Sequence, residues 1–326
     1  MRYYRIDLTK PDGSPLTPSS LGGLGISSLL QNGQNNPAAL NVELDIPVAP
    51  YHSPQGQALV KIWGLGLRDL TNSFELNDAT ISIYGGMSAG LPLANPAQAQ
   101  LLIKGQVFQG FGNWVGTEQT VDMILMPSTG TNGNPLNFVL DWTAGMTLGA
   151  ALSATLNTAL PGAKQAINLN PRLVLDHDEV GYYATLTQLA GVLNPLSRSI
   201  ITDPGYPGVS ISYNGETVTV SDLYGPATQT KTIAFQDLIG QPTWIAPQMI
   251  QVKTVMRGDI DLLDVVTLPQ TLTTNTQAAL TRFRDKTTFS GNYVVQNIHH
   301  WGNFRQPDAA SWNTTFEMFP QPAAAG

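Results

Sequence analysis

Short runs of alternating apolar and polar residues recur through the first 130 positions of this 326-residue chain. Alternation over four to eight residues, bounded by turn residues, is typical of half-buried β-strands. The runs are Tyr3 to Leu8, Asn41 to Pro47, Ala58 to Leu65, Thr80 to Tyr84, Leu101 to Phe108 and Gln119 to Leu125. Many short, evenly spaced strands predict a barrel or a sandwich. Gly105, inside the fifth run, predicts a bulge or a bend.

The segments between these strands carry weaker signals. Ser14 to Pro37 is a long polar loop, of a length that is usually functional or ordered by a partner, and Leu24 to Leu30 within it are expected to form a short helix. The cluster Asn132-Gly133-Asn134-Pro135 is dense in turn residues, and the character of the sequence changes there.

Two helices are predicted after this change. The first has apolar residues on one face, a possible cap at Thr147 and a stop at Pro161-Gly162. Its apolar face consists of Leu148, Ala151, Leu152, Leu156 and Ala159. The second is expected over Tyr182 to Leu193 and is expected to end at Asn194-Pro195, because the residue before a proline disfavours the helical conformation.

Strand patterns return around and after these helices. Asn214-Gly215 is a strong hairpin signal between two of them. The predicted strands are Ile167 to Leu169, Val209 to Tyr213, Thr217 to Val220, Met249 to Met256, Asp264 to Leu268, Asn292 to His299 and Trp312 to Met318.

The fold class predicted from this order is α+β and mainly β, with two β-barrel or sandwich domains flanking a small α/β insert. The expected limits are 1–135 for the first β domain, 136–240 for the insert, 241–320 for the second β domain and 321–326 for a disordered tail.

Charge, cysteine content and the lengths of apolar runs exclude several classes of function. Sixteen Lys and Arg stand against 23 Asp and Glu, and no stretch concentrates the basic residues that binding to a phosphate backbone requires. The absence of cysteine excludes disulfides, thiolate metal sites and cysteine nucleophiles. Neither a signal peptide nor an apolar run of membrane-spanning length is visible, so we expect a soluble protein made in a cytoplasm that does not itself insert into a membrane.

One cluster has the residue types of a metal site. Asp176, His177, Asp178 and Glu179 are consecutive, and carboxylates beside an imidazole could bind a divalent cation. The order matches no calcium loop, and no second cluster supplies further ligands. The favoured interpretation is a solvated turn ahead of the second helix, and no metal, cofactor or catalytic residue is predicted.

The adjacent histidines of His299-His300-Trp301 are a second candidate. Neighbouring residues on a strand point to opposite faces, so the two imidazoles are not expected to share a metal. The sequence predicts one histidine inward, the other outward, and Trp301 packed or at an interface.

Other motifs do not indicate an enzyme. Gly64-Leu65-Gly66 and Gly22-Gly23-Leu24-Gly25 lack the spacing of a dinucleotide fingerprint, and no G-x-S-x-G elbow is present. These observations favour a non-enzyme. An enzyme stays an alternative, because distant residues can assemble a catalytic triad or a glycosidase carboxylate pair.

Four segments of the first strand region carry a more specific pattern of strands and glycines. These are Val60 to Gly66, Ile81 to Met87, Gly90 to Leu93 and Gly105 to Trp114. The series resembles phage tail baseplate hub proteins of the tail-tube-initiator type. The similarity continues through the helix Thr147 to Leu160, Gly181 to Leu186, Tyr206 to Val209, Phe289 to Val295 and Trp312 to Glu317, and covers most of the chain.

This resemblance implies a homotrimer whose two tail-tube-like domains per chain form a ring of six, joining a sixfold tail tube to a threefold spike. The implied partners are the tube or tube-initiator protein, the central spike, other baseplate proteins and the tape-measure protein, with DNA crossing the lumen without specific binding. The implied location is the baseplate of a virion. Relatives often carry extra domains, and no spike or lysozyme portion is visible here, so the spike is expected to be a separate chain.

Two other functions remain open from the sequence. Trp63, Trp114, Trp301 and Trp312 could stack on sugars in a receptor- or carbohydrate-binding tail module. A cell-wall hydrolase at the tail tip could use Glu179 or Asp178.

Overall fold

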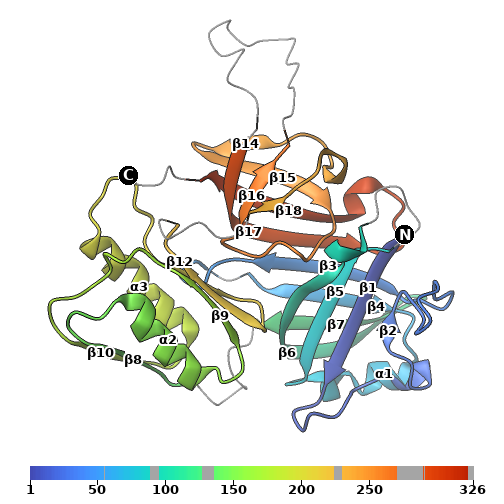
Figure 1. Cartoon of the computed structure of the whole chain (residues 1–326). Helices are drawn as coiled ribbons and strands as arrows, with labels where there is room; N and C mark the ends of the chain where they lie inside the picture. Colours follow the sequence, from blue (N-terminus) through green and yellow to red (C-terminus); the bar gives the residue numbers. More distant parts are fainter. Residues whose placement is uncertain are drawn as a thin grey trace, which may run out of the picture.

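The structure is a computed structural model that describes residues 1–54, 56–88, 95–126, 136–223, 230–269, 289 and 291–321. Two strand-rich parts lie against each other, and a part with two helices lies beside them (Figure 1). Asn132 to Pro135, Gly90 to Leu93, Ser290 and the tail beyond Gln321 lie outside the described residues. Among the described residues, none of the helices has the length and apolar character needed to span a bilayer.

The first strand-rich part is an antiparallel sheet in the order β3-β4-β7-β6-β5-β1-β2. Its strands are β1 (Arg2–Thr9), β2 (Ile26–Ser27), β3 (Asn41–Val48), β4 (Ala58–Trp63), β5 (Thr80–Met87), β6 (Gln100–Val115) and β7 (Glu118–Met126), and helix α1 spans Leu67–Thr71. The six strands predicted here are confirmed, since alternating apolar side chains point into one core.

Two local predictions in this part are wrong. Leu24 to Leu30 do not form a helix, because Ile26 pairs with Ile6 of β1 and continues the sheet edge. Gly105 is not a bulge and pairs in register with Ile81. The extra residues of β6 are Leu102, opposite β5, and Phe108, opposite β7.

The middle part contains two helices and five short strands. They are β8 (Phe138–Trp142), α2 (Leu148–Ala159), β9 (Lys164–Asn168), β10 (Glu179–Tyr183), α3 (Leu186–Ile200), β11 (Ser210–Tyr213) and β12 (Thr217–Ser221). The first predicted helix is confirmed, and the Thr147 side chain accepts a hydrogen bond from Ala150 N at 3.4 Å as the predicted cap. The predicted hairpin is also confirmed, with Gly215 in the left-handed region at φ 94°.

The second predicted helix is wrong at both ends. Tyr182 lies in β10, where it pairs with Val139 of β8, and Thr185 caps the helix three residues later. Pro195 lies inside α3, which continues to Ile200. The proline ring lacks an N–H and crowds the carbonyl four residues earlier, which is that of Gly191; the side chain of Pro195 is exposed, and the packed residues Leu193 and Ser197 lie on the buried side.

The second strand-rich part consists of β13 (Lys231–Thr232), β14 (Thr243–Ala246), β15 (Met249–Val255), β16 (Val265–Leu268), β17 (Gly291–Asn303) and β18 (Trp312–Pro320). The four strands predicted here are confirmed. β13 lies before the predicted limit at 240, yet it pairs with β16. At the end of the described chain, Gln321 N donates to Asn292 O at 2.9 Å.

Strand β17 joins the two strand-rich parts into one sheet. Its residues 291–294 pair with β16 and its residues 298–303 pair with β3, while β18 covers its other edge. The path of hydrogen-bonded strands then runs from β14 to β2 without closing on itself. The described chain is therefore mainly β, as predicted, and sandwich-like rather than a closed barrel.

Three apolar cores underlie this arrangement. One is built mainly from β1 and β3 to β7, one from the helical part together with Tyr51, and one from the second strand-rich part. Met256 and Trp312, from the second strand-rich part, pack into the first core. Trp312 also donates its indole N–H to Gly86 O at 2.9 Å, which fastens the two strand-rich parts together.

Candidate assembly surface

The face of the shared sheet opposite its apolar cores is continuous across both strand-rich parts. Residues paired across neighbouring strands point to the same side of a sheet, so the register follows one face from strand to strand. One row of this face is Val255, Asn313, Trp301, Asp45, Leu59, Ile124 and Gln109. A second row is Asn303, Glu43, Lys61, Asp122 and Phe111. The same side of these strands also carries Trp63, Lys253, Asn297, His299 and Glu317. We call this surface the polar sheet face.

Side chains on the polar sheet face bond to one another across strands. His299 Nε2 lies 2.7 Å from Asp45 Oδ1, which links β17 to β3 at the junction of the two parts. Asn297 Nδ2 donates to Glu317 Oε2 at 2.8 Å. Such contacts between neighbouring strands hold the polar groups of the face in fixed positions.

A second group lies where the face crosses β4, β6 and β7. Asn113 Nδ2 donates to Asp122 Oδ2 at 2.8 Å, and Lys61 Nζ lies 3.7 Å from the same carboxylate oxygen. The Lys61 ammonium also lies 5.7 Å from the ring centre of Trp63. A depression of about 280 Å³ opens on the face between Asp45, Lys61 and Trp301.

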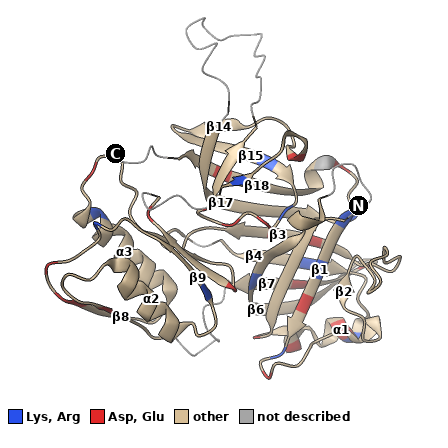
Figure 2. Ribbon diagram, in the orientation of Figure 1, with Lys and Arg blue, Asp and Glu red and all other residues tan. Residues whose placement is uncertain are grey.

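Carboxylates outnumber ammonium groups on this face. On strands β15, β18, β17, β3, β4 and β7, the carboxylates are those of Glu43, Asp45, Glu118, Asp122 and Glu317, and the ammonium groups are those of Lys61 and Lys253. Charged residues are sparse over most of the chain (Figure 2). The face therefore presents a polar surface with an excess of negative charge and no concentrated positive patch.

The two adjacent histidines behave as the strand pattern predicts. His299 is exposed on the polar sheet face, whereas His300 is only 2 % exposed and faces the core. His300 Nδ1 lies 2.9 Å from Thr314 Oγ1, and burial lowers the pKa of its imidazole from 6.5 to about 3. The two rings cannot share a ligand, and Trp301 is half-buried beside His299.

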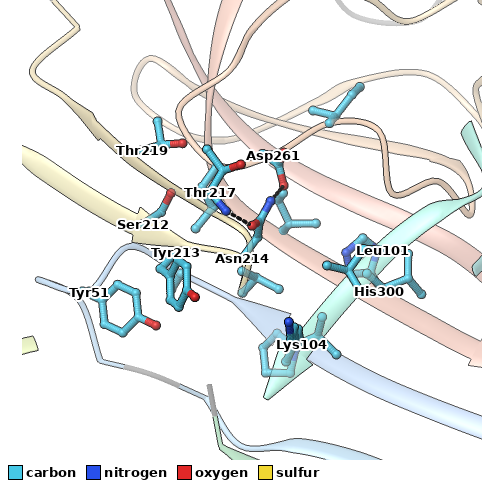
Figure 3. A pocket seen from close by; sticks show the side chains of 18 residues that line it. Tyr51, Leu101, Lys104, Ser212, Tyr213, Asn214, Thr217, Thr219, Asp261 and His300 are labelled. Carbon is cyan, nitrogen blue, oxygen red and sulfur yellow. Dashed lines mark hydrogen bonds between the residues drawn. The ribbon is translucent and has the colours of Figure 1, made fainter. Parts of the chain in front are cut away.

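A small cavity lies where the helical part meets the two strand-rich parts (Figure 3). Asn214 Nδ2 donates to Asp261 Oδ1 at 3.2 Å across this junction, and burial raises the pKa of Asp261. The buried Tyr51 hydroxyl has no hydrogen-bond partner among the described residues. The cavity measures about 40 Å³, enough for roughly one water molecule and too small for an organic substrate.

The side chains of Asp176, His177, Asp178 and Glu179, which have the residue types of a metal site, do not converge on one point. The side chains of Asp176 and His177 are 97 % and 62 % exposed, and Asp178 Oδ1 accepts a hydrogen bond from Ala144 N at 2.8 Å. The segment is a bend that leads into β10 rather than into a helix. In the described ranges, no group of three or more His, Asp or Glu side chains is placed to hold a metal ion.

The four tryptophans considered for sugar stacking are in different environments. Trp312 is 2 % exposed and packed in the core, so the expectation that it could stack on a sugar is wrong. Trp63 and Trp301 are half-buried on the polar sheet face. Trp114 is 64 % exposed at the tip of the β6-β7 hairpin, where its indole N–H donates to Gly116 O.

The architecture is that of two strand-rich parts which are separated in sequence by a helical insert and share one sheet with a continuous polar face. The 43 kDa tail protein of prophage MuSo2 from Shewanella oneidensis is similar, with a TM-score of 0.50 and 8 % identity over 98 % of this chain and 99 % of that one. The resemblance to phage tail hub proteins that the sequence motifs indicate is thus confirmed at the level of the fold.

Two further solved structures align over much of the chain. The tail protein from Neisseria meningitidis MC58 has a TM-score of 0.47 and 8 % identity, over 97 % of this chain and 96 % of that one. The E. coli c3393 protein, a component of the type VI secretion system similar to T4 bacteriophage tail proteins gp27 and gp5, has a TM-score of 0.47 and 10 % identity, over 87 % and 76 %. No known family and no curated protein matches the sequence.

Proposed function

We propose that this protein is a structural hub of a phage tail baseplate, which forms a trimeric ring between the tail tube and the central spike. The observation that carries the proposal is the single sheet formed by the two strand-rich parts. They are joined where β3 pairs with β17, strands about 250 residues apart in the sequence. Two β units held side by side in each chain would give a threefold complex six similar units around its axis.

The three domains of the proposal follow the sequence limits 1–135, 136–240 and 241–320. The three apolar cores support this division, and the pairing of Lys231–Thr232 with β16 favours an earlier start for the third domain. The outer domains would build the ring, and the helical insert would lie beside it.

In this ring the polar sheet face lines the channel. Its half-buried carboxylates Glu43, Asp45 and Glu317 would repel the phosphates of DNA, so that DNA and the tape-measure protein pass without adhering. The two rims would contact the tube or tube-initiator protein and the spike, together with other baseplate proteins. The protein would act in the virion by holding its partners, with no substrate turned over.

Mass measurement of the purified chain tests the ring. We expect particles with the mass of three copies, and electron microscopy is expected to show an annulus that binds the end of a tube when tube protein is added. A single copy at every concentration, with no binding to tubes, would contradict the hub.

The alternative of a carbohydrate-binding tail module rests on Trp114, whose ring is 64 % exposed. Glycan binding that is lost in Trp114→Ala, by a protein that does not assemble, would favour it. A cell-wall hydrolase using Glu179 or Asp178 predicts a clearing band in a zymogram that disappears in Glu179→Gln.

A further inference from the structure

The shared sheet has two free ends. Its hydrogen-bonded path begins at β14 and finishes at β2, and each of these strands pairs with one strand only within the described part of the chain. The outer edge of β2 is partly covered, because Ser27 O accepts a hydrogen bond from Asn36 Nδ2 at 3.0 Å. β14 lies at the top of Figure 1 and β2 at the lower right. Free strand edges invite pairing with another chain, and proteins that remain monomeric usually protect such edges with charged residues.

The β14 end lacks this protection. Residues 233–250 contain one ionisable side chain, Asp237, which is buried and paired with Arg257. All four residues of β14 are exposed. The apolar side chains here are Phe235, Trp244 and Ile245, exposed by 67 %, 53 % and 43 %. An exposed apolar surface free of charge has the composition of an interface core.

The β2 end carries few charges, and Arg5 on the neighbouring strand forms an ion pair with Asp7. Residues 13–42 form the longest stretch of the chain without Asp, Glu, Lys, Arg or His, and they include β2 and the loops around it. Leu24 and Leu30 are exposed by 56 % and 36 %. The nearby carboxylate of Asp69 already accepts hydrogen bonds from Ser19 N and Ser20 N at 2.7 and 3.0 Å.

We propose that the β14 end of one copy binds the β2 end of the next copy. This inference rests on the proposed ring and names the surfaces that close it. The β14 end supplies an unpaired strand edge, and both ends supply exposed apolar side chains. Arg5 on β1, beside Ser27, is already paired with Asp7, so few charges lose water in the contact. Because the two surfaces differ, the contact is heterologous, and repetition of one rotation closes a ring.

Two single variants test the contact. Ile245→Asp places a charge at the β14 end, and Leu24→Asp places one at the β2 end. Both positions are exposed, so neither change strains the fold, and circular dichroism should show unchanged melting. Each variant alone is expected to lose the oligomer and to sediment as one copy. Tyr182→Asp, at a residue that is 77 % exposed on the helical insert, is the matched control and should keep the wild-type mass.

Mixing the two variants separates this contact from other modes of assembly. Each variant retains one intact end, so an equimolar mixture should form a particle of two copies, one of each variant, and nothing larger. No association in the mixture, or a wild-type oligomer from either variant alone, would overturn the contact and leave the ring standing. A wild-type chain that is a single copy at every concentration would overturn both.

Discussion

Arg257 donates from Nη1 to Asp237 Oδ2 at 3.2 Å, and both side chains are almost completely buried. The same guanidinium binds Asp259 through two hydrogen bonds of 2.7 Å. Asp237 Oδ2 also accepts a hydrogen bond from Gln98 Nε2 at 2.9 Å, and Gln98 belongs to the first strand-rich part. The network therefore joins the two strand-rich parts through fully paired charges.

Removing the cation of this network should destabilise the fold strongly. Arg257→Met leaves Asp237 buried without its counter-charge, and we expect a loss of about 3–5 kcal/mol in the free energy of unfolding. Urea denaturation measures it. As the control, Arg172→Met removes the exposed pair with Asp203 and should leave the denaturation midpoint unchanged. Equal midpoints for the two variants would show that the buried network does not hold the parts together.

His300 should make the protein less stable in acid. Its folded pKa is about 3, whereas the unfolded chain takes up this proton near pH 6.5. Between these two pH values the unfolded state binds a proton that the folded state does not bind. The free energy of unfolding should therefore fall by about 1.4 kcal/mol for each pH unit by which the pH is lowered.

His300→Gln should remove this contribution, which urea denaturation at several pH values between 4 and 6.5 would show as a shallower pH dependence. His177→Gln is the control, because a hydrogen bond with Asp176 raises the pKa of the exposed His177 and its contribution has the opposite sign. An unchanged slope in His300→Gln would mean that another group controls the acid response.

The local parts of the fold were predictable from sequence because their signals are local. The alternation of apolar and polar residues predicted the strands, and the cap at Thr147 with the apolar face that follows it predicted α2. The second helix failed because the segment around Tyr182 carries apolar residues that fit a strand as well as a helix. Only pairing with β8, about 40 residues earlier, decides between them.

The candidate surface was not predictable in the same way. Asp45 and His299 lie 2.7 Å apart although 254 residues separate them, and no periodicity within either strand shows that pairing. The charge-free stretches at 13–42 and 233–250 are visible in the sequence. What the sequence does not show is that they lie at the two ends of one sheet.

Gly215 should be required where the helical insert meets the first strand-rich part. It has φ +94°, and a Cβ there would lie 2.5 Å from Lys104 Cβ. Gly162 has nearly the same φ, +91°, with nothing within 4 Å, so Gly162→Ala reports the backbone cost alone, about 1–2 kcal/mol. Gly215→Ala should cost a further 1–3 kcal/mol, roughly, from the clash. Equal unfolding free energies for the two variants would mean that Lys104 and its neighbours move away from the added Cβ without an energetic cost.

Charge reversal on the polar sheet face tests whether it faces DNA. A triple variant with Glu43→Lys, Asp45→Lys and Glu317→Lys should bind duplex DNA in a mobility-shift assay where the wild-type chain does not, because phosphates then meet ammonium groups. The logarithm of its affinity should fall against the logarithm of salt concentration with a slope of about 0.9 for each phosphate contacted.

The matched control carries Asp176→Lys, Asp178→Lys and Glu179→Lys, which change the net charge equally on the helical insert. If the polar sheet face lines the channel, DNA ejection by assembled tails should slow in the face variant and stay at the wild-type rate in the control. Equal DNA binding by both triple variants would show that net charge alone is responsible. Unchanged ejection in the face variant would place this surface away from the path of the DNA.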